Sequence, residues 1–151
     1  ITTRDLSAKY PETPREVVKL YNRILKCYFG EEWTEEELKQ LAEHAYELMD
    51  TDLQKENGTV EDYLASVKED IEEYKEEGRT ISQTDVSDSN DVEQKTKDGE
   101  KIAYVNASYF VKVGSKYENT YQEYILRRDD NEKWRILGFH LIDNPNGSKE
   151  D

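Results

Sequence analysis

Apolar residues recur every three or four positions through the first half of the chain, which is the spacing of a helix with one buried face. Three such stretches each begin with a capping signal, and the first, 13–16, also places Pro14 at the first helical position. Gly30 and Gly78 follow the first and third stretches and are typical helix ends. The pattern therefore predicts helices over 13–30, 34–50 and 59–78.

From Arg79 onward, apolar and polar positions alternate, which is the period of a strand with one buried face. Residues 98–99, 114–115 and 129–132 separate the longer stretches and are typical of turns. Residues 87–95 indicate a turn or bulge, with pairing resumed near its end. The predicted strands are 80–86, 102–113, 117–128 and 134–142.

Helices first and strands second define an α+β chain rather than an alternating α/β chain. We expect three N-terminal helices to pack on one face of a curved four-stranded antiparallel sheet. No internal repeat or linker divides the sequence, and 151 residues suit one domain. We therefore predict a flexible segment over 1–12, a single domain over 13–143 and a disordered tail over 144–151.

Charge narrows the classes of partner. The chain holds 21 Lys and Arg against 35 Asp and Glu, a formal net charge of −14. Nucleic acids and anionic membranes are disfavoured because both require basic side chains. The longest apolar runs, such as Ile136 and Leu137, are far shorter than the roughly 20 residues that cross a bilayer. The predicted partner is an unknown small molecule or protein.

The sequence predicts no metal site and no cofactor. Cys27 is the chain's one cysteine, which excludes an intrachain disulfide and cysteine-pair zinc sites. It falls between Ile24 and Tyr28 on a helix, where a packed thiol is expected. No histidine pair has the spacing of metal ligands.

The first residue is Ile1 rather than methionine, and no signal-like apolar stretch follows it. We expect that a secretory or lipoprotein leader has been removed. This expectation places the protein outside the cytoplasm or at the cell surface, with a cytoplasmic location left open.

The order of elements, together with the closing segment KWRILGF at 133–139, resembles the NTF2-like (cystatin-like) superfamily. More narrowly, the chain is similar to small secreted or lipid-anchored proteins of unknown function from Gram-positive gut bacteria. The resemblance implies a cone-shaped domain with a pocket between the helices and the concave sheet face. It implies no single function, since the superfamily includes isomerases, dehydratases and non-enzymatic binding domains.

Alternation divides the strands into two faces. The set that contains Val105, Tyr109, Tyr124, Leu137 and Phe139 is nearly all apolar, and we expect it to face the helices. The other set mixes aromatic and polar residues and is typical of a surface that pairs with a ligand, a protein or a second copy of the chain. Its candidate ligand-binding or interface residues are Tyr104, Asn106, Tyr121 and Trp134.

An alternative assignment turns the mixed face toward the pocket. Glu123 and His140 would then be a candidate acid/base pair, because a carboxylate and an imidazole can exchange a proton near neutral pH. Tyr104 and Tyr121 could donate hydrogen bonds to a substrate oxygen.

Two tyrosines lie on the apolar face of the first helix. Tyr21 and Tyr28 are expected in the core, although in relatives that resemble ketosteroid isomerase such a tyrosine can donate to an oxyanion. No aspartate partner is evident. The acidic face of the third helix, which includes Asp70, is expected to be a solvated surface.

The resulting hypothesis is a non-enzymatic binding or protein-interaction domain of a bacterial cell-surface or secreted protein. The alternative is a small-molecule enzyme, an isomerase or dehydratase, with its pocket between helices and sheet.

Overall fold

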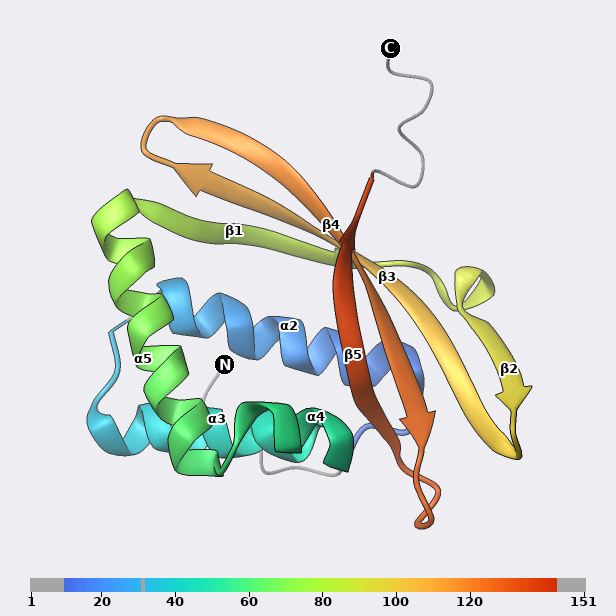
Figure 1. The fold of residues 1–151 in the computed structure, drawn as a ribbon. Coiled ribbons are helices and arrows are strands. Elements are labelled where there is room, and N and C mark those ends of the chain that lie inside the picture. Colours follow the sequence, from blue (N-terminus) through green and yellow to red (C-terminus); the bar gives the residue numbers. More distant parts are fainter. Residues whose placement is uncertain (1–9, 31, 144–151) are drawn as a thin grey trace.

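The computed structural model describes residues 10–30 and 32–143, which form an α+β fold (Figure 1). The helices are α2 (Pro14–Gly30), α3 (Glu35–Glu47), α4 (Thr51–Asn57) and α5 (Val60–Glu77). The strands that follow are β1 (Arg79–Val86), β2 (Glu93–Lys97), β3 (Glu100–Val113), β4 (Lys116–Arg128) and β5 (Trp134–Ile142), all in one antiparallel sheet. The predicted fold class is confirmed, although the described residues contain one more helix and one more strand than expected.

The additional helix arises because the second predicted helix is two helices. α3 ends at Glu47, and the Asp50 carboxylate then caps α4 by accepting a hydrogen bond from the Asp52 amide nitrogen (3.0 Å). Thr34 and Thr59 cap α3 and α5 with complete capping boxes, as their sequence patterns predict.

The additional strand arises because one edge of the sheet is broken. The strand order is β1-β3-β4-β5, and β2 pairs with the same strand, β3, that β1 borders. β1 pairs with 107–113 and β2 with 100–104. The 3-10 turn Ser89–Asp91 lies between them, which confirms the predicted interruption and the resumed pairing.

The inner face of the sheet, defined as the face that the helices cover, is the predicted apolar face along β3 and β4. Val105, Tyr109, Tyr124 and Leu126 are buried there. α2 packs against β1 and β3 and runs across this face (Figure 1). The alternation of apolar residues was sufficient to assign the faces of these two strands.

A β-bulge changes the alternation on β5. Leu126 pairs with Ile136 and Ile125 pairs with Gly138, so Leu137 is the extra residue of the bulge. Residues before the bulge therefore point to the sheet face opposite to the one that uninterrupted alternation from Phe139 would give them.

This bulge corrects part of the predicted face assignment. Trp134 was expected as an interface or ligand residue on the mixed face, but it is 6% exposed and belongs to the core. Ile136 is likewise buried against the helices. Phe139 follows the bulge on the inner face as predicted, whereas Leu141 is 72% exposed.

Backbone hydrogen bonds attach β5 to the helical layer. The Ile136 amide donates to the Leu48 carbonyl (2.8 Å), and the Asp50 amide donates to the Ile136 carbonyl (2.7 Å). The Arg127 guanidinium donates to the buried Asp50 carboxylate at 2.5 and 3.1 Å. Removing either partner would leave a poorly compensated charge, so this contact holds the two layers in one arrangement.

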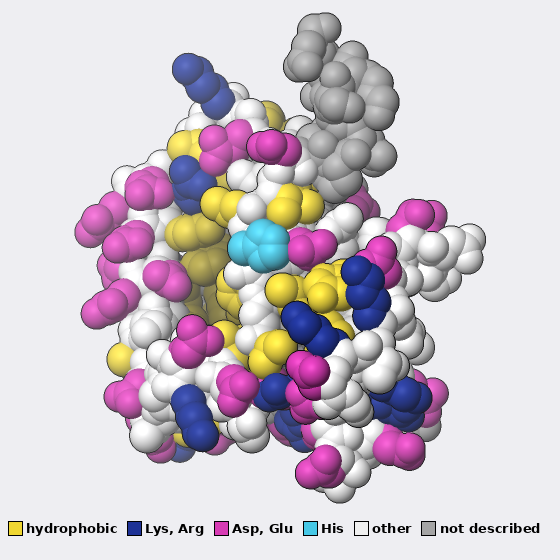
Figure 2. Space-filling model, turned by 45° about the vertical axis from the view of Figure 1, so that its right-hand side comes forward, with side chains coloured by type: hydrophobic (Ala, Val, Ile, Leu, Met, Phe, Trp, Pro, Cys, Tyr) yellow, Lys and Arg dark blue, Asp and Glu magenta, His cyan; other side chains and the backbone are white. Residues whose placement is uncertain are grey.

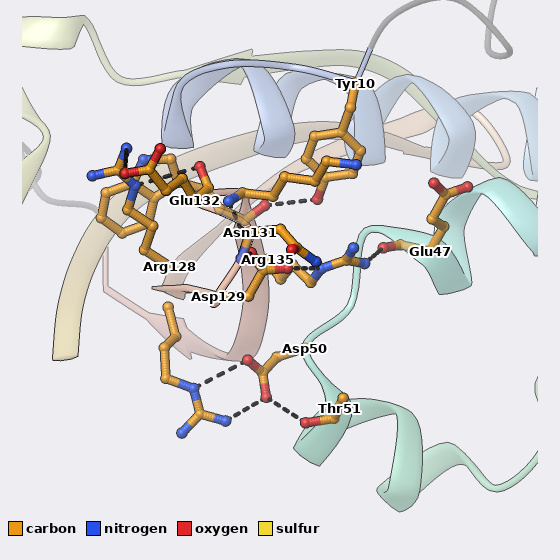
Figure 3. A network of polar contacts seen from close by, with 12 residues as sticks. Tyr10, Glu47, Asp50, Thr51, Arg128, Asp129, Asn131, Glu132 and Arg135 are labelled. Carbon is orange, nitrogen blue, oxygen red and sulfur yellow. Dashed lines mark hydrogen bonds and ion pairs between the residues drawn. The ribbon is translucent and has the colours of Figure 1, made fainter.

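A second group of polar contacts strengthens the same end of the molecule (Figure 3). The Arg135 guanidinium donates to the Asp129 carboxylate (2.7 Å) and to the Glu47 carbonyl. The Tyr10 hydroxyl donates to the Trp134 carbonyl (2.7 Å). Residue 10, part of the segment expected to be flexible, is thus attached to β5.

The remaining terminal predictions concern residues 1–9 and 144–151, which lie outside the described residues. Among the residues that are described, no helix has the length and apolar character needed to span a bilayer.

Candidate ligand-binding site

A cavity of about 170 Å³ lies between α2, α5 and β5. Figure 2 shows a hollow on this side of the molecule, with hydrophobic side chains at its bottom and acidic side chains along its left rim. Both layers of the fold contribute to it. The lining residues are Tyr21, Leu25, Tyr28, Phe29, Met49, Asn57, Tyr63, Ser66, Val67, Asp70 and Phe139.

The two helices present matching patterns to the cavity. On α2, Tyr21, Leu25 and Tyr28 are spaced by four and three residues, so they lie on one side of the helix. On α5, Tyr63, Val67 and Asp70 follow the same spacing. The cavity is therefore bordered by two helical faces, each with a tyrosine at its beginning.

Phe139 completes the wall from the sheet. Its ring lies 6.1 Å from the Tyr21 ring and 5.2 Å from the Tyr124 ring, measured between centroids. The side chain is 42% exposed, so it borders the opening rather than the deepest part of the core. Phe139 follows the Leu137 bulge and pairs with the buried Tyr124 on the inner face of the sheet.

Three tyrosine hydroxyl groups meet beside the cavity, and we call Tyr21, Tyr28 and Tyr63 the cavity cluster. The Tyr28 and Tyr63 oxygens are 3.4 Å apart, a long contact for two hydroxyl groups. Burial raises the pKa of all three tyrosines. The hydroxyl groups are therefore neutral at physiological pH and can donate to or accept from a bound molecule.

Asp70 is the charged member of the lining among the described residues. It is largely exposed, at the rim. Partial burial raises the pKa of its carboxyl group, and the carboxylates of Glu73 and Glu69 raise it further. The rim is thus a place where negative charge is concentrated and incompletely compensated.

A second hollow, of about 310 Å³, lies on the other side of Tyr28 between the start of α3 and α5. Its lining includes the ion pair of Lys68 with Glu35, whose atoms are 2.6 Å apart. Both charges are substantially exposed, so water screens this site. We regard the cavity near Phe139 as the better candidate because aromatic side chains enclose it.

The predicted acid/base residues are neighbours in the structure. Glu123 and His140 form a cross-strand pair, with the Nε2 and Oε1 atoms 3.3 Å apart. They lie on the outer face of the sheet, where the His140 side chain is 52% exposed. Neither residue lines either of the two hollows.

The remaining predicted site residues also lie on the outer face. Tyr104, Asn106 and Tyr121 are half-buried there. The Lys95 ammonium group lies 5.6 Å from the centre of the Tyr104 ring. Trp134, as noted above, is in the core instead.

Sequence reasoning separated residues that the structure brings together. Tyr21 and Tyr28 were considered as oxyanion donors without an aspartate partner, while Asp70 was assigned to a solvated surface. The structure places both tyrosines and Asp70 around one cavity. One feature of the sequence could have indicated this grouping. Asp70 follows Tyr63 by seven residues and therefore lies on the same helical face.

The described part of the chain contains no candidate metal site. No group of three or more His, Cys, Asp or Glu side chains there is arranged to hold a metal ion.

Comparison with known protein families assigns the chain to a family. Residues 1–139 match a family described as a domain of unknown function, DUF6715. The chain belongs to this family. No curated protein matches the sequence. The description of DUF6715 states no activity.

Proposed function

We propose that this DUF6715 domain is a non-enzymatic binding domain that holds a small molecule between α2, α5 and β5. The observation that carries the proposal is the cavity cluster, which places three neutral hydroxyl groups beside an aromatic-lined cavity of about 170 Å³. Apolar walls with a few polar groups are the usual composition of a small-molecule site. The site also agrees with the pocket position of an NTF2-like cone, which we propose as the architecture.

Binding is favoured over catalysis because the hydroxyl groups suit recognition better than proton transfer. A tyrosine whose pKa is far above 7 exchanges its proton poorly at neutral pH. Glu123 and His140 lie on the outer face, away from the cavity. The domain would therefore select and retain its ligand without changing it.

Magnetic resonance with small probes tests this proposal. Cyclohexanol, cyclohexanone, benzoate and piperidine would be added separately to the ¹⁵N-labelled protein. We expect at least one probe to bind with a Kd below ~1 mM and to shift amide signals of α2, α5 and β5. Ser66→Trp adds bulk at a lining residue and should abolish these shifts, whereas Ala65→Trp, at the neighbouring residue that does not line the cavity, should retain them.

Two results would contradict binding in the cavity. One is that no probe shifts any cavity signal in the unmodified protein. The other is that Ser66→Trp and Ala65→Trp bind equally well.

The enzymatic alternative predicted from the sequence names Glu123 and His140, and a different enzymatic candidate rests on Asp70, a lining residue of the cavity beside the tyrosine hydroxyl groups. An isomerase would use that carboxylate to remove a proton beside a carbonyl group. The cyclohexanone sample distinguishes this role in deuterated buffer. Exchange of the hydrogens beside the carbonyl group that is faster with the unmodified protein than in buffer alone would support the enzyme. The Ser66→Trp variant should then leave the rate at its value in buffer.

The outer sheet face supports a further proposal, that two copies of the domain pair through it. Phe110 and Tyr117 stack with ring centroids 4.7 Å apart, and Tyr117 is 54% exposed. Exposed aromatic groups are enriched in protein interfaces. We expect sedimentation to show dimers that Tyr117→Glu dissociates; a monomer at all concentrations would exclude this contact.

We also propose that the domain belongs to a secreted or cell-surface protein, a location that follows from the resemblance given above. The complete reading frame tests this directly. A hydrophobic leader ahead of Ile1 would support it, and a start in a cytosolic domain would contradict it.

A further inference from the structure

The cavity has a marked chemical bias. Of its eleven lining residues, five are aromatic, one is a carboxylate and none is Lys, Arg or His among the described residues. The aromatic members are Tyr21, Tyr28, Phe29, Tyr63 and Phe139. Such a lining offers attraction to positive charge and no group that would neutralise an anion.

We propose that this cavity selects an organic cation, an amine or quaternary ammonium group, over neutral molecules of the same size. The inference rests on the proposed binding function and names the class of ligand for that site. Aromatic rings attract cations through their negative faces, and the attraction increases when the cation leaves water. The partly enclosed cavity is lined by five aromatic side chains, of which Phe29 has one ring face covered by the stacked Tyr74 ring at 3.9 Å.

The protein's own cations do not occupy these rings. Within the described residues, Arg and Lys groups lie over Tyr10, Tyr74 and Tyr104. None of these contacts involves a ring of the cavity. On α5, Lys68 pairs with Glu35 at 2.6 Å and lines the second hollow rather than this cavity.

Asp70 supplies the opposite charge at the rim. Partial burial and then the carboxylates of Glu73 and Glu69 raise the pKa of its carboxyl group and so oppose its ionisation. A bound cation would relieve this repulsion, whereas an anion would increase it. The net charge of −14 further raises the local concentration of cations and slows the approach of anions.

The test compares two probes that differ in charge and hardly in shape: choline, and 3,3-dimethylbutan-1-ol, in which carbon replaces the ammonium nitrogen. Titrations followed by amide signals of α2, α5 and β5 would give both affinities at low salt. We expect choline to bind at least tenfold more tightly. Asp70→Asn should weaken choline binding several-fold and leave the neutral alcohol unaffected.

Glu76→Gln is the matched control, because it removes the same charge from α5 at an exposed position outside both hollows. It should alter choline affinity much less than Asp70→Asn does. If Glu76→Gln and Asp70→Asn have the same effect, the general acidity of the surface explains the binding and the proposed site is overturned.

The remaining outcomes separate the two proposals. Equal affinity for choline and the alcohol overturns the selection of cations and leaves the binding function intact. Choline binding that persists in Ser66→Trp places the cation outside the cavity and also overturns the inference. If the unmodified protein binds neither these probes nor the four earlier ones, the binding function itself fails.

Discussion

Two tyrosine clusters lie next to each other in this domain and differ in how their hydroxyl groups are satisfied. The closed cluster consists of Asn22, Tyr109 and Tyr124, whose polar oxygens are 2.5–3.1 Å apart. In the cavity cluster of Tyr21, Tyr28 and Tyr63, the two hydroxyl oxygens of Tyr28 and Tyr63 are 3.4 Å apart. The clusters adjoin, since the Tyr21 and Tyr124 rings meet edge to face at 5.9 Å.

The comparison shows that burial alone does not distinguish a structural tyrosine from a binding one. Burial raises the pKa of Tyr109 and Tyr124 as it does for the cavity cluster. In the closed cluster, the two hydroxyl protons are shared among the Asn22 carbonyl oxygen and the two tyrosine oxygens, so both are used within the protein, while the Asn22 amide nitrogen is buried without a hydrogen-bond partner among the described residues. The hydroxyl groups beside the cavity keep capacity for a ligand.

The largest effect that would test this difference comes from removing one hydroxyl group in each cluster. Tyr124→Phe should lower the free energy of unfolding by about 1–2 kcal/mol, because short buried hydrogen bonds to Asn22 and Tyr109 are lost. Tyr63→Phe should lower it by less than Tyr124→Phe does, because the contact of Tyr63 with Tyr28 is long at 3.4 Å, although Tyr63 also shares a hydrogen bond with Tyr21. Urea unfolding followed by circular dichroism measures both values.

Tyr109→Phe is a control within the closed cluster and should resemble Tyr124→Phe. Equal losses for Tyr124→Phe and Tyr63→Phe would show that the two clusters do not differ as described. In the binding experiments the order should reverse, with Tyr63→Phe affecting a probe more than Tyr124→Phe does.

Features set by neighbouring residues along the chain could be predicted from the sequence. The capping boxes of Thr34 and Thr59, the broken edge strand and the inward face of β3 and β4 all depend on local patterns. The bulge at Leu137 could not be predicted, because alternation within one strand carries no information about its register with the next. Trp134 was misplaced for this reason.

Only part of the candidate site could be predicted from the sequence, for a related reason. Tyr21 and Tyr28 could be placed on one helical face, but their neighbours around the cavity come from α5, more than thirty residues later. The packing of α5 on α2 depends on the whole fold. Asp70 stands in a run of acidic residues, and that composition predicts a solvated surface whether or not one member borders a cavity.

The smallest expected effect concerns Asp70, the charged residue of the open region. Its pKa in the folded protein is raised above the ordinary value of 3.8, so folding disfavours the carboxylate. The stability that depends on a protonated Asp70 is fully present below pH 3.8 and is lost as the pH rises through the folded-state pKa.

Asp70→Asn should therefore raise the Tm at pH 7 by on the order of 1 °C, and the gain should vanish below about pH 3.8. Glu76→Gln removes the same charge from α5 outside the cavity and should show a smaller gain, so scanning calorimetry of both variants at pH 7 and pH 3.5 isolates the rim charge. A gain for Asp70→Asn that persists unchanged at the lower pH would mean that folding does not destabilise the carboxylate, and the cavity beside the cavity cluster would lose the rim charge that the closed cluster lacks.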